Sequence, residues 1–223
     1  MLTRVLVAIN VIAYIWEKLT GALDTNDALV AHGALVGTLV AQQGQWWRIF
    51  TSSFLHGSEI HILFNMIALW QVGTFIEMIY GTPRMAFIYF FSALGYGIAV
   101  TEFTPTDVTV GASGAIFGLF SALAVAGLRM GAPGRAILKQ TIGIIVINLI
   151  IGFTLPNISN AGHIGGLLFG AVSGFALYRK PKPAPPVPVY AQRIDPRYDA
   201  STMTIEHPPL DQPGEEPHEE PHA

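Results

Sequence analysis

The sequence contains no cysteine among its 223 residues, so it has no disulfide, no thiolate metal site and no cysteine nucleophile. Charge is also scarce. Only 12% of the residues are charged and 51% are hydrophobic, whereas roughly a quarter of a soluble domain is charged. The clusters of basic residues on a polar domain that nucleic-acid binding requires are missing as well. These absences exclude thiol chemistry and nucleic-acid partners, and they point to the lipid bilayer.

Long apolar stretches are what the chain has instead, and a helix that crosses a bilayer needs about 20 mostly apolar residues. We interpret the first stretch as a retained helix, because no small-residue cleavage site precedes Glu17. The connection at residues 20–60 is long and amphipathic, and its Trp46-Trp47-Arg48 cluster is typical of a membrane interface. We therefore predict an all-α polytopic membrane protein with six transmembrane helices, at residues 2–19, 61–80, 85–101, 113–128, 136–154 and 163–179.

The basic residues predict the orientation of these helices, because loops rich in Lys and Arg stay in the cytoplasm. Lys18 and Arg48 fall on one side of the six-helix arrangement. On the other side fall Arg4, Arg84, Arg129, Arg135, Lys139, Arg179, Lys180 and Lys182. We predict that both termini are cytoplasmic and that residues 20–60 face outward.

The composition changes after residue 180. Residues 1–180 hold nine Lys/Arg and seven Asp/Glu, a net charge of +2, whereas residues 181–223 hold three and eight, a net charge of −5. A proline-rich acidic segment cannot bury enough apolar surface to offset the entropy of ordering it. We predict a membrane domain at 1–180 and a disordered cytoplasmic tail at 181–223.

Polar residues inside spanning helices are expensive in lipid, so each is a functional candidate. Ser113 and His163 each open a glycine-rich helix on the outward half of the membrane. A serine hydroxyl is a poor nucleophile unless a neighbouring base takes its proton, and an imidazole is such a base. A helix N-terminus disfavours imidazolium and stabilises an oxyanion, and the N–H of Ser113 lies in the first turn, where it is free to donate. This pair predicts a proteolytic dyad.

Further residues predict how the dyad is supported. His61 and Asn65 are four residues apart and share one helix face, where they are candidate oxyanion donors. Phe117 lies one turn below Ser113 and is expected to pack on the imidazole. Gly166 and Gly170 have the spacing that permits close helix approach.

Plainer alternatives exist for every one of these residues. A serine often bonds to its own helix backbone, a histidine or asparagine often bonds between helices, and spaced glycines serve ordinary packing.

Glu77 lies far from His61, near the cytoplasmic end, where we expect it to pair with backbone N–H groups or with a base such as Arg84. No carboxylate is therefore available as a third catalytic member, and we predict a dyad.

Three stretches together resemble the rhomboid family of intramembrane serine proteases. Trp47-Arg48 followed by FTSSFLHGSEIHILFNM resembles the first-loop Trp-Arg and the His-x4-His-x3-Asn run of the family. GASGAIFGL resembles its Gly-x-Ser-Gly nucleophile motif, and NAGHIGGLLFG resembles the His-x-x-Gly motif of its last core helix. The resemblance covers roughly residues 1–180.

The resemblance implies a six-helix rhomboid-like bundle with a long first loop, in a prokaryotic inner or plasma membrane. It implies Ser113 as nucleophile, His163 as general base, and His61, Asn65 and the Ser113 amide as the oxyanion hole. It also implies that His56 supports the first loop and a water-filled cavity, and that Trp47 and Arg48 anchor this loop at the interface. Phe117 departs from the tyrosine of many members, and it keeps the ring but loses the hydroxyl.

The implied function is an intramembrane serine endopeptidase that cleaves single-span membrane proteins through an acyl-enzyme, opens to the extracytoplasmic side, and uses neither metal nor cofactor. One alternative is a catalytically silent rhomboid-like protein that binds membrane clients. Another is a small transporter or metal carrier that uses His56, His61 and His163. The sequence leaves open the oligomeric state, the cleavage-site preference, and the gating residues of the fifth helix, where Asn148 is polar.

Overall fold

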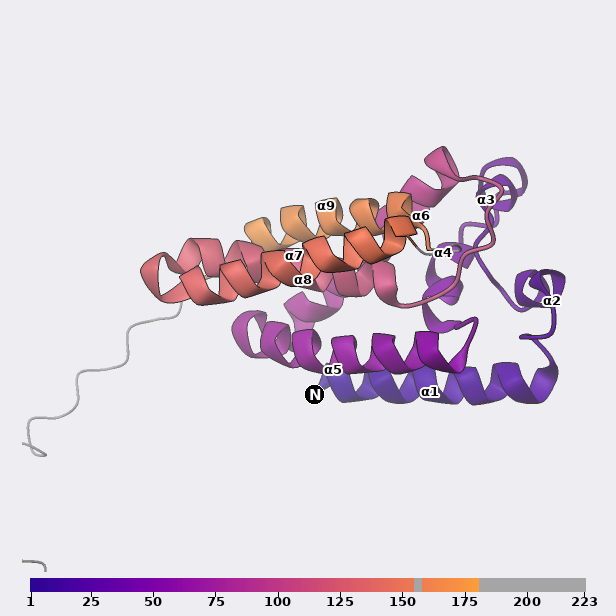
Figure 1. The fold of residues 1–223 in the computed structure, drawn as a ribbon, viewed down its shortest axis with the longest axis horizontal. Helices are drawn as coiled ribbons and strands as arrows, with labels where there is room; N and C mark the ends of the chain where they lie inside the picture. Colours follow the sequence, from indigo (N-terminus) through magenta and orange to yellow (C-terminus); the bar gives the residue numbers. More distant parts are fainter. Residues whose placement is uncertain (155–157, 181–223) are drawn as a thin grey trace, which may run out of the picture. The chain divides into compact units, whose positions relative to one another are not determined.

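The computed structural model describes residues 1–154 and 158–180, and Figure 1 shows that these residues are helical almost throughout. Six long helices match the six predicted segments, and every predicted boundary lies within three residues of the observed one. The helices are α1 (Leu2–Thr20), α5 (Glu59–Tyr80), α6 (Thr82–Phe103), α7 (Ser113–Met130), α8 (Arg135–Thr154) and α9 (Asn160–Leu177). The predicted all-α fold is confirmed. The predicted tail at 181–223 lies outside the described residues.

Five of these helices, α5 to α9, are long and apolar enough to cross a membrane. The remaining long helix, α1, has 19 residues and carries Arg4 near one end and Glu17 and Lys18 near the other. Charges at helix ends are compatible with a spanning segment, because long side chains reach the interface from there. The Glu17 side chain does not reach the interface, because it is fully buried in the protein.

The connection between α1 and α5 is folded into short helices, which lie at the right-hand end of the bundle in Figure 1. They are α2 (Asn26–Ala31), α3 (Gly37–Gln43), α4 (Arg48–Thr51) and the 3₁₀-helix η1 (Ser52–Phe54). Leu35 and Thr109 exchange two backbone hydrogen bonds of 2.9 Å each, which join this connection to the loop before α7. The first loop is thereby fixed beside the end of the bundle at which α5, α7 and α9 begin.

The start of α9 differs from the predicted one. The Ser159 hydroxyl accepts a hydrogen bond of 3.2 Å from the backbone N–H of Gly162, which is the usual side-chain cap of a helix N-terminus. As a result α9 begins at Asn160, and His163 is its fourth residue and not its first. The prediction that His163 opens the helix is therefore wrong by one turn. Its ring still lies at the same end of the bundle as Ser113.

Glycines bring α7 and α9 into backbone contact. A methyl group at Gly166 would lie 2.2 Å from the carbonyl oxygen of Gly114, and one at Gly170 would lie 2.2 Å from that of Gly118. Any side chain at these positions would force the two helices apart. In contrast, α8 lies at the periphery of the bundle. Only 11% of its most apolar stretch is buried, against 39–61% for the other four helices that are apolar enough to span a membrane.

Glu77 anchors the start of α1 to α5. Its buried carboxylate accepts hydrogen bonds from the Leu2 N–H at 2.7 Å, the Thr3 N–H at 3.2 Å and the Thr3 hydroxyl at 2.9 Å. The Thr82 hydroxyl donates a fourth bond at 2.7 Å. The prediction that Glu77 pairs with backbone N–H groups is thus confirmed, whereas the Arg84 guanidinium donates to the Tyr80 carbonyl instead.

We expect Glu77→Ala to lower the free energy of unfolding by about 3 kcal/mol, because it leaves the buried N–H and hydroxyl of Thr3 and the half-buried N–H of Leu2 without an acceptor. The matched control is Glu59→Ala, which removes an exposed carboxylate paired with Lys18 and should leave the free energy of unfolding nearly unchanged. Denaturant titration of the purified protein in detergent measures both. Equal effects of the two substitutions would contradict this account of Glu77.

Candidate active site

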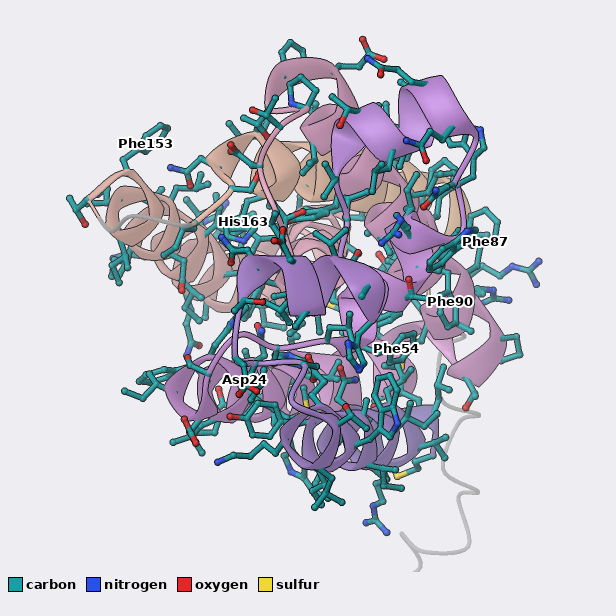
Figure 2. The ribbon with its side chains drawn as sticks, turned by 90° about the vertical axis from the view of Figure 1, so that its right-hand side faces the viewer. Asp24, Phe54, Phe87, Phe90, Phe153 and His163 are labelled. Atoms are coloured by element: carbon teal, nitrogen blue, oxygen red, sulfur yellow. The ribbon has the colours of Figure 1, made fainter. Side chains whose placement is uncertain are left out.

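The site is built on the contact between Ser113 and His163, which come from two neighbouring helices. Ser113 is the first residue of α7, and its hydroxyl oxygen lies 2.9 Å from Nε2 of His163 on α9. His163 is only 6% exposed, and Figure 2 shows it toward the centre of the molecule, whereas Phe153 projects outward from the end of α8. Ser113 is only partly buried. A hydroxyl within hydrogen-bond distance of an imidazole is the arrangement that a serine nucleophile requires of its base.

The imidazole of His163 is held flat against an aromatic ring. Phe117 stacks on it with a centroid separation of 4.2 Å and an interplanar angle of 12°. Phe117 therefore packs on the imidazole as predicted, although it lacks the hydroxyl group of a tyrosine. The second ring nitrogen of His163, Nδ1, is buried and has no hydrogen-bond partner among the described residues. Among the described residues, the His163 ring is therefore held by stacking and not by a carboxylate bonded to Nδ1.

Gly111 brings His61 and Asn65 to the start of α7. Its φ of +123° is one that residues with side chains rarely adopt. A methyl group there would lie 2.7 Å from Nε2 of His61 and 3.4 Å from Nδ2 of Asn65. Asn65 is buried, and its amide nitrogen has no partner within the described part of the chain. The two predicted donors thus lie beside the backbone two residues before Ser113.

His56 lies behind His61, at an interplanar angle of 66° and a centroid separation of 5.1 Å. It is fully buried, and its backbone N–H donates to both carboxylate oxygens of Glu17, each at 3.1 Å. Burial lowers the pKa of His56 to about 3, with a smaller effect from the neighbouring His61, so the ring is neutral at physiological pH. A neutral imidazole avoids the penalty of a buried charge beside His61.

Trp47 and Arg48 have different surroundings. Trp47 is 50% exposed, in keeping with an interfacial position, and the Arg48 guanidinium lies 4.6 Å from the centre of its ring. Arg48 itself is buried, and it donates to the carbonyl oxygens of Val30 at 2.7 Å and Ala34 at 2.8 Å. The guanidinium therefore connects separate parts of the first loop from inside, which the neighbouring tryptophans in the sequence did not indicate.

Two buried residues near the site belong to none of the predicted motifs. Glu17 is an ionisable side chain inside an apolar stretch, and that alone is a sign of function in a membrane helix. Tyr96, on α6, is 4% exposed and packs beside His163 with a ring-centroid separation of 6.2 Å. Its only sequence signal is a phenol placed between Gly95 and Gly97 in an apolar segment.

No group of three or more His, Asp or Glu side chains in residues 1–154 and 158–180 is arranged to hold a metal ion. The three histidines of the metal-carrier alternative make other contacts. His163 contacts Ser113, while His56 packs edge-on against His61.

Residues 43–180 match the Rhomboid domain. Similar proteins include "Rhomboid protease GluP" of Bacillus subtilis (strain 168), 39% identical over 78% of this chain and 34% of that protein. "RHOMBOID-like protein 1" of Arabidopsis thaliana is 34% identical over 79% of this chain and 45% of its own length. "Rhomboid-like protease 1" of Toxoplasma gondii is 34% identical over 80% and 65%, respectively. The chain thus spans between about one third and two thirds of these relatives.

Proposed function

Because the chain belongs to the rhomboid family, we propose that it is an intramembrane serine endopeptidase whose dyad is Ser113 and His163. The observation that carries the proposal is the 2.9 Å contact between the Ser113 hydroxyl and Nε2 of His163, in a bundle of membrane helices. We place this activity in residues 1–180. The substrates are single-span membrane proteins, cut within or near the spanning segment.

Acylation uses the dyad as a nucleophile and a base. Nε2 of His163 takes the proton of the Ser113 hydroxyl as the oxygen attacks the carbonyl carbon of the scissile peptide bond. The tetrahedral intermediate then collapses, the carbon–nitrogen bond breaks, and the imidazolium gives its proton to the leaving amine. The product that stays on the enzyme is an ester between the substrate carbonyl and the Ser113 oxygen.

Deacylation repeats these steps with water. His163 takes a proton from the attacking water, and it returns a proton to the Ser113 oxygen as the ester bond breaks and the carboxylic acid leaves. In both halves of the reaction the negative oxygen is stabilised by the Ser113 N–H in the first turn of α7, together with the side chains of His61 and Asn65. The packing of these two side chains against Gly111 supports this assignment.

The membrane context determines how the substrates and water reach the dyad. By the distribution of basic residues, we place both termini in the cytoplasm and the dyad toward the extracytoplasmic side. Water then enters from that side, between the first loop and the helix ends. The small buried share of α8, which packs chiefly on α7, is compatible with lateral approach of a substrate helix past α8 and the exposed Phe64 of α5.

The test is cleavage of a single-span protein by the purified chain after both are reconstituted in phospholipid vesicles. We expect two fragments, with the cut located by mass spectrometry inside or next to the spanning segment. An isocoumarin inhibitor should abolish cleavage, because it acylates an activated serine, whereas EDTA should leave the rate unchanged. Cleavage that resists the inhibitor and stops with EDTA would overturn the serine-protease proposal in favour of a metal-dependent one.

A further inference from the structure

Tyr96 fills the space between the two helix starts that carry the dyad. A methyl group at Gly114, next to Ser113, would lie 2.3 Å from Cδ2 and 2.4 Å from Cγ of Tyr96. A methyl group at Gly162, next to His163, would lie 2.3 Å from Cε2 and 2.5 Å from Cδ2 of the same ring. The three atoms nearest to each of these positions all belong to Tyr96. One phenol ring therefore touches the backbone of α7 and the backbone of α9 at the same level.

The ring is firmly held in this position. Tyr96 is 4% exposed and packs with Leu35, Val40, Ile49 and Val100 in one apolar cluster. The end of the phenol lies beside the side chains of Thr109 and Ser159. Each of these is itself fixed, since Thr109 pairs with the first loop through Leu35 and Ser159 caps α9. An aromatic side chain has only two torsion angles, so it acts as a rigid spacer.

We propose that Tyr96 is a positioning residue that sets the separation between the starts of α7 and α9, and thereby the contact between Ser113 and His163. The inference rests on the proposed proteolytic function. Below the dyad, glycines allow the backbones of α7 and α9 to touch. At Gly114, next to Ser113, and at Gly162, next to His163, the Tyr96 ring instead lies closest to the side of each backbone. Without the ring, the atoms that lie nearest to Gly114 and Gly162 are gone, and the two helix starts can shift relative to each other.

A displacement of about 1 Å between reacting groups can lower a rate by about 10²-fold. We therefore expect Tyr96→Ala to lower kcat by about 10²-fold, with KM for a fluorogenic single-span peptide in vesicles nearly unchanged. Tyr96→Phe keeps the ring and is expected to retain most of the activity. The matched control is Tyr89→Ala, which removes a fully buried tyrosine from the same helix two turns away, where it belongs to a different apolar cluster from Tyr96. It should lose stability to a similar degree but keep most of its kcat.

A double-variant cycle tests the same idea from the glycine side. Gly162→Ala alone should lower kcat strongly, because its methyl group meets the Tyr96 ring at 2.3 Å. In Tyr96→Ala/Gly162→Ala the methyl group enters the space left by the ring, so the double variant should be faster than the product of the two single effects predicts. If Tyr96→Ala does not fold, Tyr96→Leu replaces it, since it keeps an apolar side chain but not the ring.

The positioning role of Tyr96 would be overturned if the effects of Tyr96→Ala and Gly162→Ala on kcat simply multiplied in the double variant. It would also be overturned if Tyr89→Ala lost as much kcat as Tyr96→Ala. Failure of the proposed function and failure of the Tyr96 role give different results. If the wild-type chain cleaves no single-span peptide, the proposed function itself fails. If the wild type cleaves and Tyr96→Ala cleaves equally fast, only the role of Tyr96 is wrong.

Discussion

Ser113→Ala is expected to lower kcat for cleavage of a single-span substrate by about 10⁶-fold, and His163→Ala is expected to do nearly the same, because a nucleophile and its base act as one unit. Once either residue is missing, no proton can pass between the Ser113 hydroxyl and Nε2 of His163, which lie 2.9 Å apart. The remaining residue then contributes little. The double variant Ser113→Ala/His163→Ala should therefore be no slower than either single variant. Initial rates in vesicles, measured at equal protein amounts, give all three values.

The matched control for this prediction is Ser121→Ala, two turns further along α7. Ser121 is also buried, and its hydroxyl donates to the carbonyl of Gly118 and not to an imidazole. It should retain most of its activity. Multiplicative losses in Ser113→Ala/His163→Ala would show that the two residues act independently, which contradicts a dyad.

Gly170→Ala and Gly166→Ala are expected to have the next largest effects, because each adds a methyl group 2.2 Å from a carbonyl oxygen of α7. Backbone cannot rotate away as a side chain can, so α9 must move. Overpacking of this kind costs about 1–3 kcal/mol of folding free energy. A shift of about 1 Å at His163 adds a loss of about 10²-fold in kcat. Denaturant titration and initial rates measure the two effects separately.

Gly143→Ala is the control, because a methyl group at Gly143 in the middle of α8 meets nothing within 4 Å. Alanine favours a helix over glycine by about 1 kcal/mol, so this variant should be as stable as the wild type or slightly more stable. If Gly166→Ala behaved like Gly143→Ala, close packing of α7 and α9 would not be what positions His163.

The parts of this structure that could be predicted from the sequence are those with a local cause. The six long helices follow from apolar stretches of membrane length, and their boundaries agree to within three residues. Ser113, His163 and Asn65 attract attention because a polar group in a spanning helix is expensive. The stacking of Phe117 on His163 follows from helical spacing, since one turn separates Phe117 from Ser113.

The parts that could not be predicted depend on contacts between distant segments. Glu17 reaches the backbone of His56, 39 residues away, and nothing near Glu17 in the sequence indicates that partner. Arg48 follows two tryptophans, which suggested an interface, yet its guanidinium bonds to carbonyl groups of the first loop. Tyr96 contacts Gly114 and Gly162 from a third helix, so its position depends on how three helices pack and not on any local pattern.

Covalent labelling shows directly whether the Ser113 hydroxyl is an activated nucleophile. The purified chain is incubated with a fluorescent fluorophosphonate, digested, and analysed by mass spectrometry to locate the modified residue. The account predicts a single adduct on Ser113, which is absent in Ser113→Ala, greatly slowed in His163→Ala and retained in Ser121→Ala. Labelling of a different residue, or undiminished labelling of His163→Ala, would contradict it.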